Sequence, residues 1–79
     1  MAEAAVKVRV LRRGKRAAEL LAAVFHKLGL EAREPDDAGL VTLTVGSRGP
    51  QAWEMVRDAL DASGPDWREW LHLEPRPRR

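Results

Sequence analysis

The chain has 79 residues, enough for one small domain that buries only about 60–65% of its unfolded surface on folding. Its apolar share of 44% and charged share of 33% exclude a disordered chain, and the absence of cysteine excludes disulfides, thiolate nucleophiles and zinc-thiolate sites. The net charge of +2 is uneven: residues 1–28 hold seven basic and two acidic side chains, residues 29–75 four and ten, and residues 76–79 three basic ones.

The first predicted element is a strand over residues 6–10. Val6, Val8 and Val10 alternate with Lys7 and Arg9, which is the period of two shown by a half-buried strand. One face of this strand is therefore apolar and the other is basic.

A helix is predicted over residues 15–28, because "KRAAELLAAVFHKL" is rich in alanine and leucine. Its apolar side chains recur three and four residues apart, as on the core-facing side of an amphipathic helix: Ala17, Leu20, Leu21, Val24 and Leu28. Gly29 stands where a glycine commonly ends a helix, with Lys27 in the last turn.

A hairpin is expected next. Residues 30–35, "LEAREP", are a weak strand candidate, and "PDDAG" is a turn. In residues 40–45 the apolar Val41, Leu43 and Val45 alternate with Thr42 and Thr44, which predicts a second strand of the hairpin.

A second helix is predicted over residues 51–62, after "GSRGP", since Pro50 suits the first helical position. One stripe of this helix is apolar: Ala52, Met55, Val56, Ala59 and Leu60. Trp53 lies beside this stripe, and two interpretations stay open. It packs at the seam between helix and sheet, or it belongs to an exposed helix face that binds a partner.

The last element contains two of the three tryptophans. A strand over "WREWLHLEP", residues 67–75, puts Trp67 and Leu71 on the core side and Arg68, Trp70 and His72 on the other side. A helical turn over "PDWREWL" is the alternative, because Trp67, Trp70 and Leu71 are also three and four residues apart. We prefer the strand, since residues 72–75 continue an extended pattern.

In chain order these elements form an α+β arrangement that resembles the ferredoxin-like βαββαβ two-layer sandwich. The resemblance covers about residues 5–74 and concerns architecture, without a family sequence motif. It implies an antiparallel sheet of order 4-1-3-2, with both helices on one face and the other face open. We expect a single domain over residues 1–75 and a disordered basic tail over residues 76–79.

Both ends of such a sandwich carry charge. At one end we expect basic residues to balance acidic ones in neighbouring turns: Arg12, Arg13, Lys15 and Arg16 beside Asp36, Asp37, Asp61 and Asp66. At the other end a candidate anion site combines a helix N-terminus with arginines: Ser47, Arg48, Gly49, Arg76, Arg78 and Arg79. The alternative there is an ordinary turn and a solvated tail.

Several observations argue against an enzyme. "GSRGP" lacks the Gly-Lys-Ser/Thr ending of a phosphate-binding P-loop, and the two histidines, His26 and His72, lie on different elements without partners at motif spacing. Asp36 and Asp37 are adjacent in a turn, which is typical of turn formation. We therefore expect no catalytic residue, no metal site and no cofactor.

Function is expected on the open face of the sheet, whose candidate residues are Lys7, Arg9, Thr42, Thr44, Arg68, Trp70 and His72. We predict a protein-interaction or oligomerisation module that binds a protein partner or a second copy, as a homodimer. The alternative is RNA or single-stranded nucleic acid, with Trp70 stacking on bases and the arginine tail holding phosphates. The aromatic pattern of an RNA recognition motif is absent from the sequence.

Membrane association is not expected. No apolar stretch reaches the length of a membrane span, and the start "MAEAAVKVRV" shows no signal-peptide pattern. We therefore expect a cytoplasmic protein.

Overall fold

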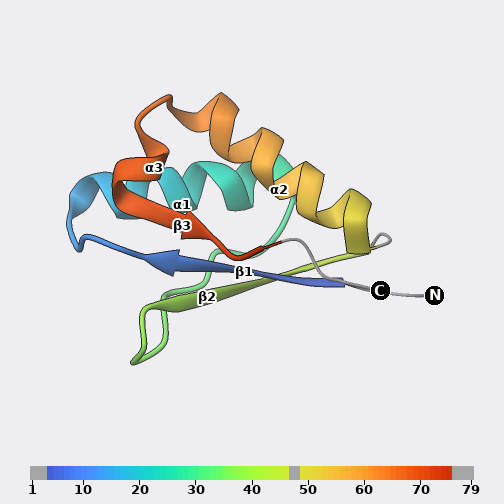
Figure 1. Cartoon of the computed structure of the whole chain (residues 1–79), viewed down its shortest axis with the longest axis horizontal. Helices are drawn as coiled ribbons and strands as arrows, with labels where there is room; N and C mark the ends of the chain where they lie inside the picture. Colours follow the sequence, from blue (N-terminus) through green and yellow to red (C-terminus); the bar gives the residue numbers. More distant parts are fainter. Residues whose placement is uncertain (1–3, 47–48, 76–79) are drawn as a thin grey trace.

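The computed structural model describes residues 4–46 and 49–75 (Figure 1). Its elements follow one another as β1 (Ala4–Val10), α1 (Lys15–Leu28), β2 (Leu40–Val45), α2 (Gly49–Ser63), α3 (Trp67–Trp70) and β3 (Leu71–Leu73).

β1 is the central strand of the sheet, with β2 antiparallel on one side and β3 antiparallel on the other. Val6 lies opposite Leu43, and Val8 lies between Val41 and Leu73. Because side chains alternate along a strand, these five residues share one face of the sheet, and all five are buried.

α1 and α2 lie side by side on this face (Figure 1), so the molecule has one helical layer and one sheet layer. The helices contribute apolar side chains to the core between the layers: Ala17, Leu20, Leu21, Val24 and Phe25 from α1, and Ala52, Val56, Ala59 and Leu60 from α2. Within the described residues, no helix lies on the other face of the sheet (Figure 1).

The predicted bounds of α1 are confirmed, and so is its end at Gly29. This glycine has a φ of 70°, in the left-handed region, and its N–H donates to the carbonyl of His26 at 3.1 Å. The next N–H, of Leu30, donates to the carbonyl of Phe25 at 2.9 Å. These bonds satisfy carbonyls that the helix end would otherwise leave free.

The apolar stripe of α2 is confirmed except at Met55. Ala52, Val56 and Leu60 are buried, whereas Met55 is 43% exposed. Met55 lies on the flank of the stripe opposite Trp53, and only the Trp53 flank packs against the core.

The strand predicted over residues 30–35 is wrong, because the chain there has no regular structure and residues 31–38 are exposed. Three charges between residues 31 and 34 leave little apolar surface to bury, and Pro35 lacks the N–H that a ladder needs. Asp36 instead forms a turn, since its Oδ1 accepts the N–H groups of Ala38 and Leu40 at 2.8 and 3.0 Å.

The strand predicted over residues 67–75 is correct only for Leu71–Leu73. Residues 67–70 form the short helix α3, in which the Trp67 N–H donates to the Gly64 carbonyl at 3.2 Å. This helical turn still buries Trp67, which is 4% exposed, and delivers Leu71 into the core.

Within the described ranges the fold is therefore α+β, with a three-stranded antiparallel sheet of order β2-β1-β3. The expected four-stranded ferredoxin-like sandwich is not confirmed, because no strand flanks β2 on its outer side in these ranges. No helix in the described part of the chain is long and apolar enough to cross a membrane.

Candidate interaction surface

The sheet face opposite the helices is formed by alternate residues of the three strands. Three rows of side chains cross it: Ala5 beside Thr44, Lys7 beside Thr42, and Arg9 between Leu40 and His72. We call Ala5, Lys7, Arg9, Thr42, Thr44 and His72 the open face. Arg9 is half-buried and the other five are exposed, so this surface is solvent-accessible and, apart from Ala5, polar.

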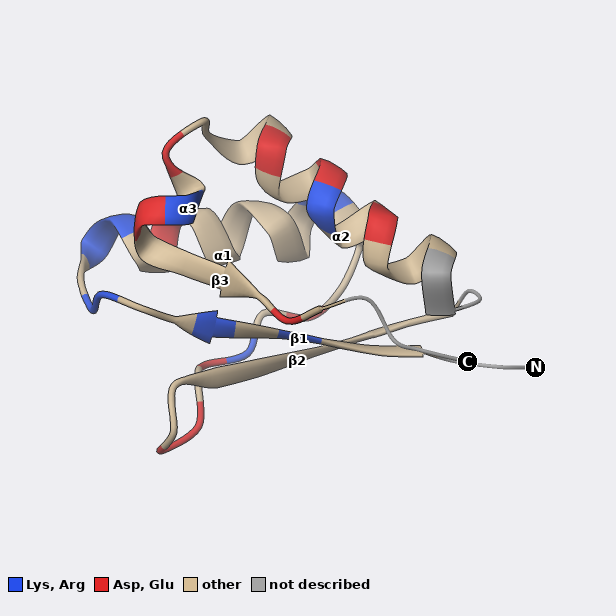
Figure 2. Ribbon diagram, in the orientation of Figure 1, with Lys and Arg blue, Asp and Glu red and all other residues tan. Residues whose placement is uncertain are grey.

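The open face is basic along β1, where Lys7 and Arg9 lie (Figure 2). Arg9 has a partial counter-charge, since its Nε lies 3.6 Å from Oε2 of Glu74. Both side chains of that pair are exposed enough for solvent to screen it, so the ion pair contributes little stability. Lys7 has no carboxylate within ion-pair distance among the described residues.

The structure places Trp70 and Arg68 away from the open face, on α3. The Trp70 ring packs at the start of α1, where a Cβ on Gly14 would lie 3.3 Å from its Cζ3, and the Arg12 guanidinium covers the ring at 4.5 Å. The predicted position of both residues is therefore wrong, and their expected role in partner binding stays a prediction. The structure brings together the other five candidates: Lys7, Arg9, Thr42, Thr44 and His72.

Arg68 instead belongs to a groove beside β3 that the sequence patterns did not reveal. The groove has a volume of about 280 Å³ and is lined by Trp53, Arg57, Trp67, Arg68, Leu71, His72 and Leu73. Each arginine lies over a tryptophan ring, Arg57 over Trp53 at 5.5 Å and Arg68 over Trp67 at 4.6 Å. One of these two pairs could have been predicted from the sequence, because Trp53 and Arg57 are four residues apart in α2.

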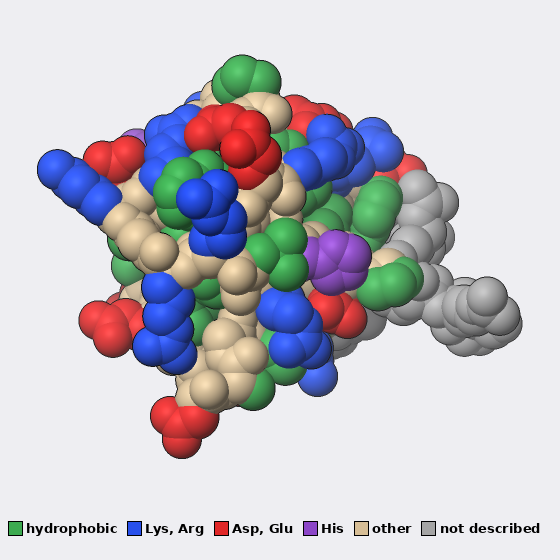
Figure 3. Space-filling view, turned by 60° about the vertical axis from the view of Figure 1, so that its left-hand side comes forward, with side chains coloured by type: hydrophobic (Ala, Val, Ile, Leu, Met, Phe, Trp, Pro, Cys, Tyr) green, Lys and Arg blue, Asp and Glu red, His purple; other side chains and the backbone are tan. Residues whose placement is uncertain are grey.

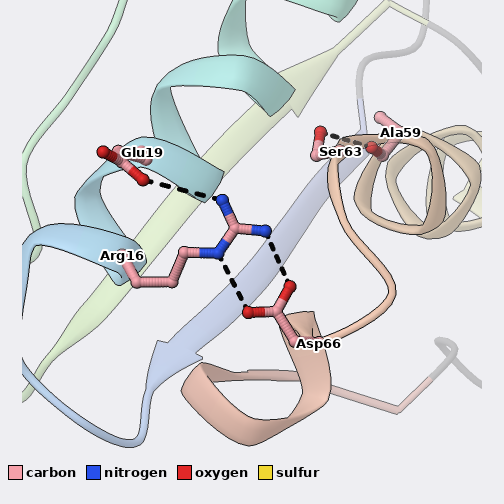
Figure 4. Close-up of polar contacts among 5 residues, drawn as sticks. All are labelled: Arg16, Glu19, Ala59, Ser63 and Asp66. Atoms are coloured by element: carbon pink, nitrogen blue, oxygen red, sulfur yellow. Dashed lines mark hydrogen bonds and ion pairs between the residues drawn. The ribbon is translucent and has the colours of Figure 1, made fainter.

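At the end of the sheet next to α3, one basic residue of the "RRGKR" segment is firmly paired. Nε and Nη2 of Arg16 donate to the two carboxylate oxygens of Asp66 at 2.9 and 2.7 Å (Figure 4). Nη1 of Arg16 lies 3.6 Å from Oε1 of Glu19, one helical turn along α1. This bidentate pair joins the start of α1 to the start of α3.

The Arg16 pair changes the acidity of both groups. Hydrogen bonding from Arg16 lowers the pKa of the Asp66 carboxyl from 3.8 to about 2. The hydrogen bond to Asp66 in turn raises the pKa of the Arg16 guanidinium. Asp66 is therefore ionised at neutral pH, and its role is to hold α3 against α1.

The expected charge balance at this end is confirmed only for Arg16. Arg12, Arg13 and Lys15 have no carboxylate within ion-pair distance in the described part of the chain. Asp61, expected as one of their neighbours, accepts the Trp67 indole N–H at 2.7 Å instead. Figure 3 shows basic side chains spread over this end of the molecule, with acidic ones between them.

The candidate anion site at the opposite end mostly lies outside the described residues, which exclude Ser47, Arg48, Arg76, Arg78 and Arg79. Gly49 begins α2. Among residues 4–46 and 49–75, no three histidine or carboxylate side chains come close enough to hold a metal ion.

Comparison with known proteins gives no relative from which a function could be transferred. No family model matches the chain, and neither a curated protein nor a solved structure matches it. The functional argument therefore rests on the residues of the surface itself.

Proposed function

We propose that this chain is a small, non-enzymatic protein-interaction module that binds a protein partner on the open face of its sheet. The observation that supports the proposal is the one-sided packing: α1 and α2 cover one face of the sheet (Figure 1). Five candidate residues lie on the other face, four of them exposed and Arg9 half-buried. A sheet face of this kind offers a rigid, preformed surface for a partner.

The charges of the open face favour a partner with an acidic surface. Lys7 and Arg9 lie on the same face of β1, and Glu74, 3.6 Å from Arg9, is the one described carboxylate within ion-pair distance of either side chain. Two copies docked face to face would bring these cations against one another, which is unfavourable. A different protein with complementary charge therefore suits this face better than a second copy does.

The test is affinity purification from the native host with three forms of the chain: wild type, Lys7→Glu and Lys27→Glu. Both substitutions reverse one exposed lysine, but Lys27 lies in the last turn of α1, on the helical layer. We expect a partner that the wild type and Lys27→Glu retain and Lys7→Glu loses. Equal retention by all three forms would refute the open face as the binding surface. Thermal unfolding verifies that each variant folds.

Nucleic acid is the second candidate. It is favoured by Arg12, Arg13 and Lys15, which have no carboxylate within ion-pair distance among the described residues. The displaced Trp70 counts against it, because its ring packs on Gly14 and is covered by Arg12 instead of facing bases. Titration with a mixed-sequence oligonucleotide at low and physiological salt separates the candidates. Tight binding that weakens steeply with salt would favour nucleic acid, and no binding at low salt would remove it.

A further inference from the structure

β2 forms an edge of the sheet, and the register shows which of its peptide groups point outward. The Val10 N–H donates to the Gly39 carbonyl at 2.7 Å, so this pair is hydrogen-bonded. In an antiparallel ladder every second opposed pair is hydrogen-bonded. The next hydrogen-bonded pairs along the ladder are therefore Val8 with Val41 and Val6 with Leu43. The N–H and C=O groups of Thr42 and Thr44 therefore point away from β1.

These outward groups have no backbone partner in the described part of the chain. The peptide groups of Leu40 also point outward, but both already bond to Asp36. The Asp36 N–H donates to the Leu40 carbonyl at 2.9 Å, and Oδ1 of Asp36 accepts the Leu40 N–H. The free part of the edge is thus limited to Thr42 and Thr44, which offer two donors and two acceptors.

A groove runs beside this free edge. It has a volume of about 210 Å³ and is lined by Phe25, Gly29, Leu30, Glu31, Arg33, Thr42, Leu43 and Thr44. Its outer wall is the segment after α1, which is exposed over residues 31–38 and forms no backbone hydrogen bond with Thr42 or Thr44. Residues 31–35 of this wall form no backbone hydrogen bond among the described residues, so an incoming strand does not have to break one to take their place.

The sequence of the edge is self-complementary. Residues 41–45 read "VTLTV", which is the same in both directions, and the whole of β2 contains no charged residue and no proline. Charges and prolines are the usual protection of an exposed edge against pairing with another strand. An antiparallel copy of "VTLTV" presents the same side chains in the same order.

We propose that β2 pairs with β2 of a second copy of this chain, antiparallel and about a two-fold axis at Leu43. Thr42 of each copy then exchanges two hydrogen bonds with Thr44 of the partner subunit, which satisfies all four outward groups on each edge. Val41 lies opposite Val45 of the partner subunit on the helical side, and threonine lies opposite threonine on the open face.

This pairing joins the two sheets into one continuous sheet. Both open faces then lie on the same side of it, and a partner protein with two acidic sites can bind both at once. The proposal uses the edge of β2 and not the charges of the open face, so it holds or fails independently of the function proposed above.

The test is a charge exchange at positions 42 and 44. In the proposed dimer, position 42 of each copy faces position 44 of the other, so there are two such pairs. In T42E/T44E both pairs are carboxylate against carboxylate, whereas in T42E/T44K both are carboxylate against ammonium. Both variants carry the same change opposite Lys7, so they differ only at position 44. Sedimentation over a concentration series is expected to show a dimer Kd raised about tenfold or more in T42E/T44E and restored in T42E/T44K.

Hydrogen exchange gives a second readout of the same proposal. In the wild type we expect the Thr42 and Thr44 amides to become protected as concentration rises, while the Val41 amide, bonded to β1, stays protected throughout. A monomer at all concentrations, or a dimer that both variants weaken equally, would overturn the proposal. Protection of Thr42 and Thr44 in a monomer would also overturn it and would assign the edge to residues 30–35.

Discussion

The three tryptophans illustrate how single residues hold this small fold. The Trp53 Nε1–H donates to the Glu74 carbonyl at 2.7 Å, and the Trp67 Nε1–H donates to Asp61. Trp70 is covered by the Arg12 guanidinium, and its own carbonyl accepts the N–H of Leu11 at 2.8 Å. Each ring is therefore engaged within the chain, and none of them stands free on the open face.

At the same scale, the Arg16–Asp66 pair predicts a pH dependence of stability. Because the folded-state pKa of Asp66 is about 2 against an ordinary 3.8, the charged pair stabilises the protein above pH 3.8 and this contribution is lost as the pH falls toward 2. We expect Asp66→Asn to lower the free energy of unfolding at pH 7, with the difference from wild type shrinking over that interval. Denaturant titrations at a series of pH values measure it.

The matched control is Asp37→Asn, which removes an exposed turn carboxylate with no ion pair among the described residues. We expect this variant to follow the wild type over the same interval. If the free energies of unfolding of Asp66→Asn and wild type differed by the same amount from pH 7 to pH 2, the role assigned to the pair would be contradicted. An NMR titration of Asp66 with a midpoint near 4 would contradict it as well.

At the scale of elements, the strong sequence patterns gave correct results and the ambiguous ones did not. Trp67 and Leu71 are four residues apart, and a separation of four brings two side chains to the same side both in a strand and in a helix. Their burial was therefore predictable while the conformation between them was not. Only Trp70 distinguishes the two cases, and its packing on Gly14 is a tertiary contact that no local pattern reveals.

The segment after α1 shows the same limit. In residues 30–35 the apolar positions are few, so whether this segment pairs with β2 depends on tertiary energies and not on its own pattern. By contrast, α1 combines a long apolar stripe with a glycine end, and β1 and β2 alternate strictly, so these three elements were predicted correctly. Five of the seven predicted open-face residues lie on β1, β2 and the short β3, and the two misplaced ones lie on α3.

Trp53 gives a prediction at the scale of elements, because it joins α2 to the end of β3. Trp53→Phe removes the hydrogen bond to Glu74 but keeps a ring, and we expect it to cost about 1 kcal/mol. Trp53→Ala also removes packing against the core and is expected to cost about 3 kcal/mol. Denaturant unfolding measures both. An unchanged stability in Trp53→Ala would instead assign this residue to a partner-binding helix face.

At the scale of the whole molecule, the two faces of the sheet have different roles. The helical layer and one sheet face bury the core. In the described part of the chain, no helix covers the opposite face (Figure 1), and the outward peptide groups of Thr42 and Thr44 on the edge of β2 have no backbone partner. The alternation of lysine and arginine with valine in β1 made the basic open face predictable from sequence. The free edge was not predictable, since it exists only because residues 30–35 do not pair with β2.

The most direct test of the central claim is chemical-shift mapping of the ¹⁵N-labelled chain with the partner that the wild type retains and Lys7→Glu loses. The account predicts that the largest shifts fall on Lys7, Arg9, Thr42, Thr44 and His72, with little change on the exposed side of α1 and α2. Shifts concentrated around exposed helical residues such as Met55, with the open face unchanged, would contradict it.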